Sequence, residues 1–484
     1  MINIILFCSI FFLILFFIYK YYLLCNKKII VNNKYYNIIK QGRLIKQGRL
    51  IKQGPLIKQG PLIKQGLLIK QRIIFILPNI YESINGVSNK YIKFIEYLNK
   101  NNYECIVLLS FVISNDNYNI DNNIIIKKYY GITPPIVYNV KAPIISEHEL
   151  QSEIINGNEI IIFNGEFLWM YSILKNIKIK NNNIKIFPTW HTDYEFYMSN
   201  VYSNSIMKFI PIKLVLHYII LFVYKNIFSG IIVTGENMKI NFTNKLLKYN
   251  LDNTIIFNAN EINLNNFKTY KIDNYNNNLY NIIYCGRIAH EKNILEIFTN
   301  CSYLTQYNIK IHIIGDGTYK NTLINIIQTD YPNLFINTIF YGELKADQIY
   351  DLYLKLDNRI YIFTSLSETF GKTPMEAGIC GIPCFIKESY ISKYLYIDKQ
   401  NALIFTNLES FINQFDYFVN LSLYNKEILI INNIENIKQY DQTKIFNNWI
   451  TYLENTKIKK IKYNYDLIKL INYFIYIIIL LIYY

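Results

Sequence analysis

Two successive sets of short apolar runs, separated by helix-like segments, place the strongest limit on how this chain can fold. The first set covers residues 73–77, 105–109, 160–163, 184–187 and 230–234, and the second covers residues 282–285, 309–314, 335–340, 360–363 and 383–386. Short apolar strands alternating with helices are typical of parallel sheets built from β-α-β units. A chain of 484 residues is long enough for two such domains. The sequence therefore predicts an α/β chain with two Rossmann-like doubly wound domains, residues 73–255 and 256–456.

The N-terminal segment, residues 1–25, has the composition of a transmembrane anchor. Residues 4–25 are interrupted only by Ser9 and Lys20, and about 20 apolar residues span the hydrocarbon core of a bilayer. No basic residue precedes the run and no small-residue cleavage site follows it, which disfavours a cleaved signal peptide. Because the lysines lie at or beyond the end of the run, the positive-inside rule predicts that the downstream chain faces the cytosol.

A basic repeat follows this segment. The hexapeptide Ile-Lys-Gln-Gly-(Arg/Pro/Leu)-Leu recurs five times between residues 39 and 71. A glycine in every unit argues against a helix, and five units would complete fewer than two coils of a parallel β-helix. We interpret residues 26–72 as a basic linker that lies on the membrane, with the β-helix as the alternative.

The C-terminal segment, residues 457–484, has the same two parts as the N-terminus in the opposite order, basic residues first and an apolar run after them. Lysines at 457, 459, 460 and 462 precede an apolar stretch over residues 470–484. Fifteen helical residues cover only about 22 Å, which is short of a ~30 Å hydrocarbon core. The tail is therefore predicted to be an anchor or an interfacial helix, or to pack on the protein.

Charge and cysteine content exclude several functions. The formal net charge is +15, and no acidic residue occurs in residues 1–81, so the basic excess lies beside the apolar N-terminus. This placement favours an anionic membrane over nucleic acid, for which the aromatic-basic interleaving is missing. The seven cysteines are scattered without a C-x-x-C pair, so no disulfide framework or zinc site is expected. Cys380 and Cys384 are predicted to be packing residues.

Residues 365–383 (SLSETFGKTPMEAGICGIP) carry the most specific chemistry. They follow the predicted strand 360–363, and open α/β sheets bind ligands at the carboxyl ends of their strands. Thr373 as N-cap and Pro374 as first helical residue predict a helix start that favours a phosphate. Glu368 and Glu376 have seven residues between them. A capping box of Thr373 and Glu376 is the alternative explanation for the second glutamate.

This segment resembles the donor-site motif of glycosyltransferase family 4, in which two glutamates have the same spacing. The resemblance extends over about residues 73–455 and implies a GT-B-type fold and retaining transfer of a sugar from a nucleotide-sugar. In that family the first glutamate approaches the donor sugar and the second hydrogen-bonds the ribose. The resemblance thus implies that Glu368 is catalytic and that Glu376 binds the donor together with Thr369, Phe370 and Gly371.

Two further loops resemble the same family. The predicted strand 282–285 runs into GRIAHEKN, residues 286–293. The resemblance implies that Gly286, Arg287 and Lys292 bind the donor diphosphate, and fixed cations stabilise the charge that a leaving diphosphate gathers. The loop after strand 309–314 contains Gly315 and Gly317, which are implied to line the base-binding wall; an ordinary turn explains them equally well.

In the first domain, residues 189–194 (TWHTDY) resemble a stretch of family members that glycosylate lipids. The resemblance implies that His191 faces the reacting sugar and that Asp193 lies in the acceptor or diphosphate loop. Gly86 lies in the loop 83–88, where the family has a glycine-rich loop, and would let the backbone approach the diphosphate or acceptor. An ordinary turn is the alternative for this loop.

The expected partners are a nucleotide-sugar donor, a lipid or glycan acceptor and a membrane, with no nucleic acid. No Asp-x-Asp motif is present, so no metal and no cofactor are expected, and Arg287 and Lys292 would take the metal's electrostatic role. The sequence departs from the family at residues 258–261 (NANE) and at Asn293, which replaces a usual glycine. A nucleotide-sugar epimerase of the same fold and a non-catalytic membrane scaffold are the alternatives.

Overall fold

The computed structural model describes residues 63–64, 67–68, 70–78, 80, 86–110, 124–129, 131–132, 142–165, 170–191, 227–248, 256–267, 270–275, 278–365, 368, 370–389 and 392–458. The chain divides into two compact units, one of Gln71–Tyr463 and a smaller one of Met1–Lys70 and Asn464–Tyr484. In the smaller unit, β1 (Ile63–Lys64) and β2 (Leu67–Leu68) pair antiparallel within one hexapeptide unit.

The predicted membrane segments fall largely outside this description. Among the described residues, no helix is both long and apolar enough to cross a membrane. The predicted anchor, residues 1–25, and the apolar tail, residues 470–484, lie outside the described residues. Both segments therefore stay predictions.

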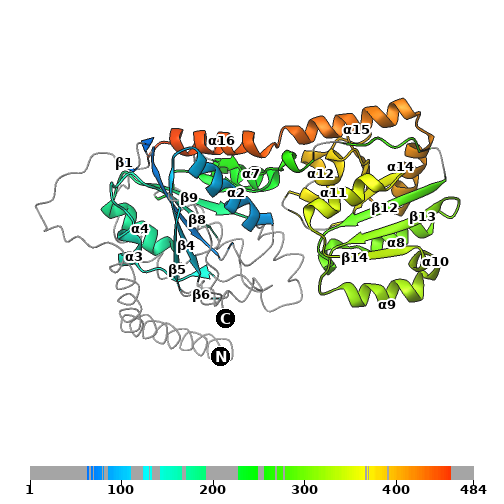
Figure 1. Ribbon diagram of the computed structural model, residues 1–484, viewed down its shortest axis with the longest axis horizontal. Helices are drawn as coiled ribbons and strands as arrows, with labels where there is room; N and C mark the ends of the chain where they lie inside the picture. The colour runs from blue at the N-terminus through cyan, green and yellow to red at the C-terminus, as the bar shows by residue number, and fades with distance from the viewer. Residues whose placement is uncertain are drawn as a thin grey trace, which may run out of the picture. The chain divides into compact units, whose positions relative to one another are not determined.

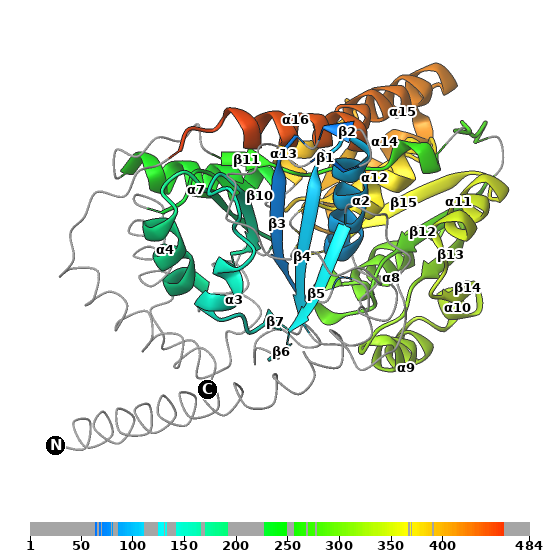
Figure 2. The same ribbon diagram turned by 60° about the vertical axis from the view of Figure 1, so that its left-hand side comes forward.

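The first large sheet has seven parallel strands in the order β11-β10-β9-β8-β3-β4-β5 (Figure 1). The strands are β3 (Arg72–Leu77), β4 (Glu104–Ser110), β5 (Ile124–Tyr129), β8 (Ile160–Asn164), β9 (Lys185–Trp190), β10 (Ile231–Val233) and β11 (Ile256–Asn258). Its described helices are α2 (Gly86–Lys100), α3 (Glu147–Gln151), α4 (Met170–Lys180) and α7 (Glu236–Lys248). Figure 2 shows β3, β4 and β5 side by side, with α2 next to them. A short antiparallel pair, β6 (Gly131–Ile132) and β7 (Ala142–Pro143), accompanies this sheet.

The second sheet has six parallel strands in the order β14-β13-β12-β15-β16-β17. The strands are β12 (Leu279–Cys285), β13 (Asn308–Ile314), β14 (Thr338–Gly342), β15 (Arg359–Phe363), β16 (Cys384–Lys387) and β17 (Leu403–Phe405). Its helices are α8 (Leu295–Ser302), α9 (Lys320–Asp330), α10 (Pro332–Ile336), α11 (Ala346–Lys355), α12 (Lys372–Ile379), α13 (Ser392–Leu395), α14 (Leu408–Asn420) and α15 (Leu423–Lys438). The order of the strands along the chain reverses between β12 and β15, and such switch points are where open α/β sheets bind ligands.

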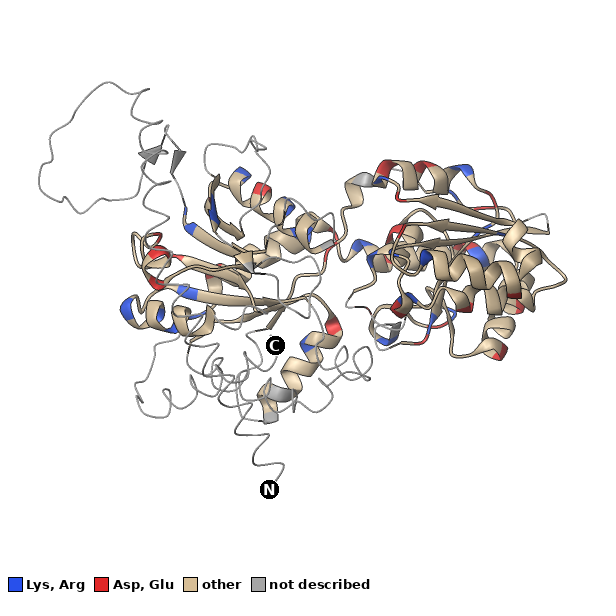
Figure 3. Cartoon of the chain, turned by 90° about the horizontal axis from the view of Figure 1, so that it is seen from below, with Lys and Arg blue, Asp and Glu red and all other residues tan. Residues whose placement is uncertain are grey.

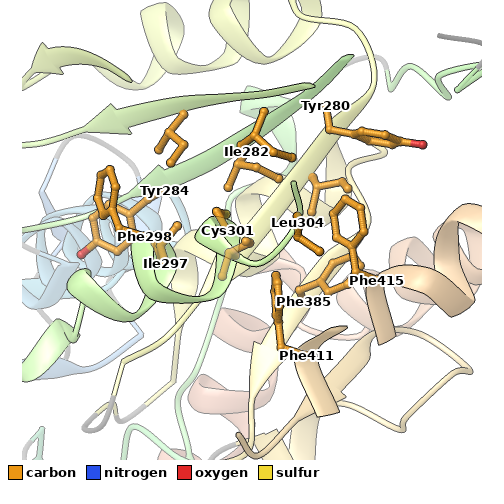
Figure 4. Packing of buried hydrophobic residues seen from close by; sticks show 14 of the residues in the cluster. Tyr280, Ile282, Tyr284, Ile297, Phe298, Cys301, Leu304, Phe385, Phe411 and Phe415 are labelled. Atoms are coloured by element: carbon orange, nitrogen blue, oxygen red, sulfur yellow. The ribbon is translucent and has the colours of Figure 1, made fainter. Parts of the chain in front are cut away.

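Both faces of the second sheet are covered, which explains why its strands read as continuous apolar runs. Ile282 and Tyr284 point to one face and pack with α8, α9 and α14, as Figure 4 shows for part of this cluster. Ile283 and Cys285 point to the other face and pack with α11, α12 and α15. The five cysteines of the described region are all free and buried. Cys380 and Cys384 belong to this second cluster, as predicted.

The last described helix, α16 (Gln442–Asn455), packs on the first sheet rather than on the second. Trp449 stacks on Phe94 of α2 with ring centroids 3.9 Å apart, and Phe446 lies against the same ring. The strand Ile256–Asn258 also pairs with the first sheet. Two segments of the predicted second domain, residues 256–258 and 442–455, therefore pack with the first sheet. The boundary between the predicted domains 73–255 and 256–456 stays a prediction.

The other differences are local. Residues 335–340 were predicted to be one strand, but Pro332 starts α10, which ends at Ile336, and β14 begins at Thr338. Among the described strands of the two large sheets, β5, β11 and β17 were missed, as were the short strands β1, β2, β6 and β7 outside them. The ribbon in Figure 3, coloured by residue type, shows basic and acidic residues interspersed along the helices around both sheets. The helices around the two sheets therefore carry charges of both signs, whereas all charged residues of 1–81 are basic.

Candidate functional site

The loops that follow β12 and β15 meet at the switch point of the second sheet. The ammonium group of Lys292 donates a hydrogen bond to the carboxylate of Glu368, 76 residues further along the chain. The hydroxyl of Thr364, directly after β15, donates to the carbonyl of Lys292 over 3.0 Å. These two bonds bring together a cation and a carboxylate that were predicted separately.

A local network fixes the backbone beside Lys292. Asn293 has a left-handed conformation with φ 51°, which asparagine tolerates and which fits its place at a usual glycine position. Its amide donates to the carboxylate of Glu296 at the start of α8, and Lys387 at the end of β16 pairs with the same carboxylate over 2.6 Å. Lys387 is 21% exposed and Glu296 is 15% exposed, so this pair is partly shielded from solvent. Sequence reasoning missed Glu296 and Lys387, because no local pattern links them.

Arg287 stands in a different environment from Lys292. It pairs with Glu291 over 2.7 Å, but its side chain is 64% exposed. An exposed ion pair between residues four positions apart contributes little stability. The guanidinium of Arg287 is therefore available to exchange Glu291 for an anionic ligand.

Gly315 and Gly317 are required by the way in which neighbouring loops pack. A Cβ atom on Gly315 would lie 2.0 Å from the carbonyl oxygen of Gly286, and one on Gly317 would lie 2.2 Å from that of Ile288. The Ile288 amide donates to the Asp316 carbonyl over 2.8 Å, so the two loops continue the pairing of β12 and β13. Close packing alone explains both glycines, and their place in a base-binding wall stays a prediction.

The start of α12 differs from its prediction. Its N-cap is Gly371, with φ 73°, and its first residue is Lys372, so Pro374 is the third helical residue. Thr373 is therefore inside the helix, where its hydroxyl accepts a hydrogen bond from Tyr361 over 2.9 Å. The capping box with Glu376 is not formed.

The side chain of the aromatic residue before this helix is buried. Phe370 is only 5% exposed, and its ring packs against Tyr440 with centroids 5.3 Å apart. Its side chain is a core residue, because it fills the space between α12 and the chain entering α16. Only its backbone is left for a donor. Thr369 lies outside the described residues.

Glu376 lies in a group of charges that the sequence did not reveal. Burial raises the pKa of Glu376 to about 7, while Lys372 opposes this rise and Glu261 adds to it. Glu261 is 1% exposed and pairs with Lys372 over 2.5 Å and with Gln442 over 2.8 Å. Lys90 of α2 belongs to the same group, because burial and then Lys372 lower its pKa to about 7. Titratable groups shifted towards neutral pH are typical of functional sites.

In the first sheet, His191 follows the end of β9, as predicted. It is 8% exposed, and its Nε2 lies 2.9 Å from the hydroxyl of Tyr91. Gly86 was predicted to lie in a loop but is the first residue of α2. The helix begins before the apolar residues from which its start was predicted. Asp193 lies outside the described residues. Sequence reasoning missed Tyr91, since nothing in the pattern links it to a histidine 100 residues away.

Two comparisons with known proteins bear on this site. Residues 267–435 match the protein family described as glycosyl transferases group 1. The chain carries a group 1 glycosyltransferase domain. This domain spans β12 to β17 and includes Gly286, Arg287, Lys292, Glu368 and Glu376. Among curated proteins, none matches the chain.

The fold of the wider chain is shared with solved structures. Sucrose-phosphate synthase from Thermosynechococcus elongatus superposes with a TM-score of 0.60 at 14% identity, over 80% of this chain and 98% of that one. A glycosyltransferase from Rickettsia africae gives 0.56 at 16% identity, over 80% and 100% of the two chains. HepE of Anabaena, in complex with UDP and glucose, gives 0.53 at 12% identity, over 79% and 99%. The group 1 glycosyltransferase domain is thus part of a GT-B-like fold with two parallel sheets.

Within the described residues, no group of three or more His, Cys, Asp and Glu side chains is arranged to hold a metal ion.

Proposed function

We propose that this chain is a retaining glycosyltransferase of family 4 that transfers a hexose from a nucleotide-sugar to a lipid or lipid-linked glycan at a membrane. The contact of Lys292 with Glu368 carries this proposal. It brings a diphosphate-binding cation and a sugar-facing carboxylate to the switch point of one sheet, where such folds bind ligands.

Each charged group has a role in the proposed reaction. Lys292 and Arg287 bind the diphosphate and stabilise the negative charge that it gathers as the glycosidic bond breaks. Glu368 approaches the donor sugar, and Glu376 accepts hydrogen bonds from the ribose. The absence of a capping box at α12 supports a ligand-binding role for Glu376, since it removes the main structural explanation for this residue.

We further propose that the reaction needs no metal ion and no other cofactor. Two cations, one exposed and one only 15% exposed, lie in the loop after β12 and supply positive charge where a metal would otherwise act. HepE of Anabaena binds UDP and glucose. This supports a nucleoside diphosphate as the product that the cations stabilise.

The sequence outside the described residues supports the proposed acceptor and location. An apolar segment at each end and a basic linker would hold the catalytic body at the cytosolic face of a membrane. Tethering raises the effective concentration of acceptors in the same membrane.

The proposal is tested by incubating the detergent-solubilised full chain with a panel of nucleotide-sugars, with and without a lipid extract. We expect release of nucleoside diphosphate that rises when lipids are added and that falls roughly 10²-fold in Glu368→Gln. Recovery of an epimer of the nucleotide-sugar without diphosphate release would instead identify an epimerase, and no turnover of any donor would favour a scaffold.

A further inference from the structure

His191 is held by a chain of hydrogen bonds that reaches back into the first sheet. Its Nε2 lies 2.9 Å from the hydroxyl of Tyr91, which also contacts the hydroxyl of Thr189. The hydroxyl of Thr189 in turn donates to the carbonyl of Phe163 over 3.1 Å. Thr189 and Tyr91 are fully buried, and the rings of Tyr91 and His191 meet edge to face.

Each hydroxyl in this series of hydrogen bonds has one proton to donate, which assigns the donor and the acceptor of each bond. A carbonyl oxygen only accepts, so the single hydroxyl proton of Thr189 points to Phe163. Tyr91 must then donate its own proton to the oxygen of Thr189. The phenol oxygen of Tyr91 can therefore only accept from His191, which requires a proton on Nε2.

The other ring nitrogen is the informative one. Nδ1 of His191 is buried and has no hydrogen-bond partner in the part of the chain that the structure describes. Burial, and then the positive charge of Lys90, hold the pKa of His191 well below its usual value, so the ring is neutral. With the proton on Nε2, Nδ1 has an unshared lone pair. A buried acceptor without a partner destabilises the folded state and needs an explanation.

We propose that Thr189 and Tyr91 lock His191 as its neutral Nε2–H tautomer, so that Nδ1 accepts a hydrogen bond from a hydroxyl of the bound ligand. The assignment of the ligand as the donor sugar or the acceptor rests on the proposed function, whereas the tautomer does not. Tyr91 and Thr189 are positioning residues, since they act through His191.

This arrangement sets a rule for the ligand. A group that donates a proton, such as a sugar hydroxyl, satisfies Nδ1. A ligand that lacks this hydroxyl leaves Nδ1 without a hydrogen-bond donor. A ligand with a carboxylate in its place puts a second acceptor next to Nδ1, and two acceptors repel each other. Sites built for one hydroxyl reject ligands that lack it, because a buried polar group is then left without a partner.

The tautomer is measured directly on the full chain labelled with ¹⁵N-histidine. The chain has only 5 histidines, so the signals of His191 are identified by their loss in His191→Gln. We expect the two-bond ¹H–¹⁵N spectrum to show a protonated Nε2 and an unprotonated Nδ1. In Tyr91→Phe we expect a mixture of both tautomers. A protonated Nδ1 in the wild-type chain overturns the proposal, whatever the activity of the protein.

Activity variants test the ligand contact. Asparagine at position 191 places its carbonyl near the position of Nδ1, whereas glutamine reaches the position of Nε2. We therefore expect His191→Asn to keep more kcat/KM than His191→Gln, by about tenfold for one hydrogen bond. Tyr91→Phe should lower kcat about tenfold with little change in the KM of the donor.

Monodeoxy analogues of the nucleotide-sugar that the wild-type chain turns over fastest, and monodeoxy acceptors, identify the hydroxyl. For one analogue, the wild-type chain should have a lower kcat/KM than for the parent compound, whereas His191→Gln should have the same kcat/KM for both. Equal kcat/KM for Asn and Gln at position 191, or wild-type turnover in Tyr91→Phe, overturns the ligand contact. A chain that turns over no nucleotide-sugar refutes the proposed function and with it this contact, while the ¹⁵N spectrum still decides the tautomer.

Discussion

Lys292 and Glu368 contact each other from loops that follow two neighbouring parallel strands, β12 and β15. Both side chains are shielded, with 15% and 23% exposed. In the ligand-free site the cation and the carboxylate therefore neutralise each other. A donor diphosphate would compete with Glu368 for Lys292, and the carboxylate would be released towards the sugar as the diphosphate binds.

Glu368→Gln is expected to lower kcat roughly 10²-fold, because the neutral amide removes a charge that acts on the reacting sugar. The amide keeps the size of the side chain, so the midpoint of thermal unfolding should stay close to that of the wild-type protein. Initial rates and thermal unfolding measured on the same preparation separate the two effects. Unchanged turnover per folded molecule would remove Glu368 from the reaction.

Addition of EDTA is expected to leave the transfer rate nearly unchanged, because we propose that Arg287 and Lys292 supply the positive charge at the diphosphate. Lys292→Met should then reduce kcat/KM more than Arg287→Met, since Lys292 is the more shielded cation. Complete inhibition by EDTA that manganese or magnesium reverses would contradict this role.

Donor affinity is expected to rise as the pH is raised through about 7, the pKa of Glu376. Below this pH the carboxyl group is mostly protonated and is a weaker acceptor for the ribose hydroxyls; above it the carboxylate accepts both. Glu376→Gln is the matched control, because the slope that remains in this variant comes from the ligand and other groups. Calorimetric titration with the nucleoside diphosphate between pH 6 and 8 measures the affinity of the wild-type protein and of Glu376→Gln. The same dependence of affinity on pH in the two proteins would argue against a ribose contact.

The sequence was sufficient for the architecture because most strands are short apolar runs that end in turn residues. It failed where tertiary contacts decide the outcome. Strand β5 lies at the edge of its sheet and has no fully buried residue, so its sequence IIIKKY lacks a fully apolar pattern. Strands β11 and β17 have three residues each and are strands only because a neighbour pairs with them.

The site could be predicted only as separate loops. Motif spacing identified Lys292 and Glu368, but their contact depends on the order of strands in the sheet. The helix start was misplaced because Thr373 and Pro374 are a strong local signal for an N-terminus. The observed N-cap is Gly371, which has a left-handed backbone that glycine adopts without steric cost. The partners Tyr91 and Glu261 carry no local signal, since each is defined by residues about 100 or more positions away.

Gly315→Ala is expected to lower the free energy of unfolding by more than about 2 kcal/mol, because the new methyl group would overlap the carbonyl of Gly286. Gly342→Ala is the matched control: its φ is also positive, at 70°, but no atom lies within 4 Å of the added Cβ. Only backbone strain, about 1 kcal/mol, should remain there. Urea unfolding of both variants gives the difference, and equal losses would show that the two loops adjust to the methyl group.

Protease added to intact, right-side-out organelle vesicles is expected to digest the region of residues 26–455 without detergent. The reason is that basic residues flank both apolar ends on the catalytic side, and each contributes about 1 kcal/mol near an anionic leaflet. Detergent-treated vesicles supply the control for complete digestion. Protection until detergent is added would place the body in the lumen, with a lumenal acceptor.

The packing of α16 on the first sheet has a consequence for how the chain is made. Trp449 fills the core beside Phe94, so a ribosome must translate almost the whole chain before this core can close. The second sheet, by contrast, is complete once residue 405 and the helices that follow have emerged. The half of the protein that is synthesised first is therefore expected to finish folding last, with an apolar surface that a chaperone would have to cover during translation.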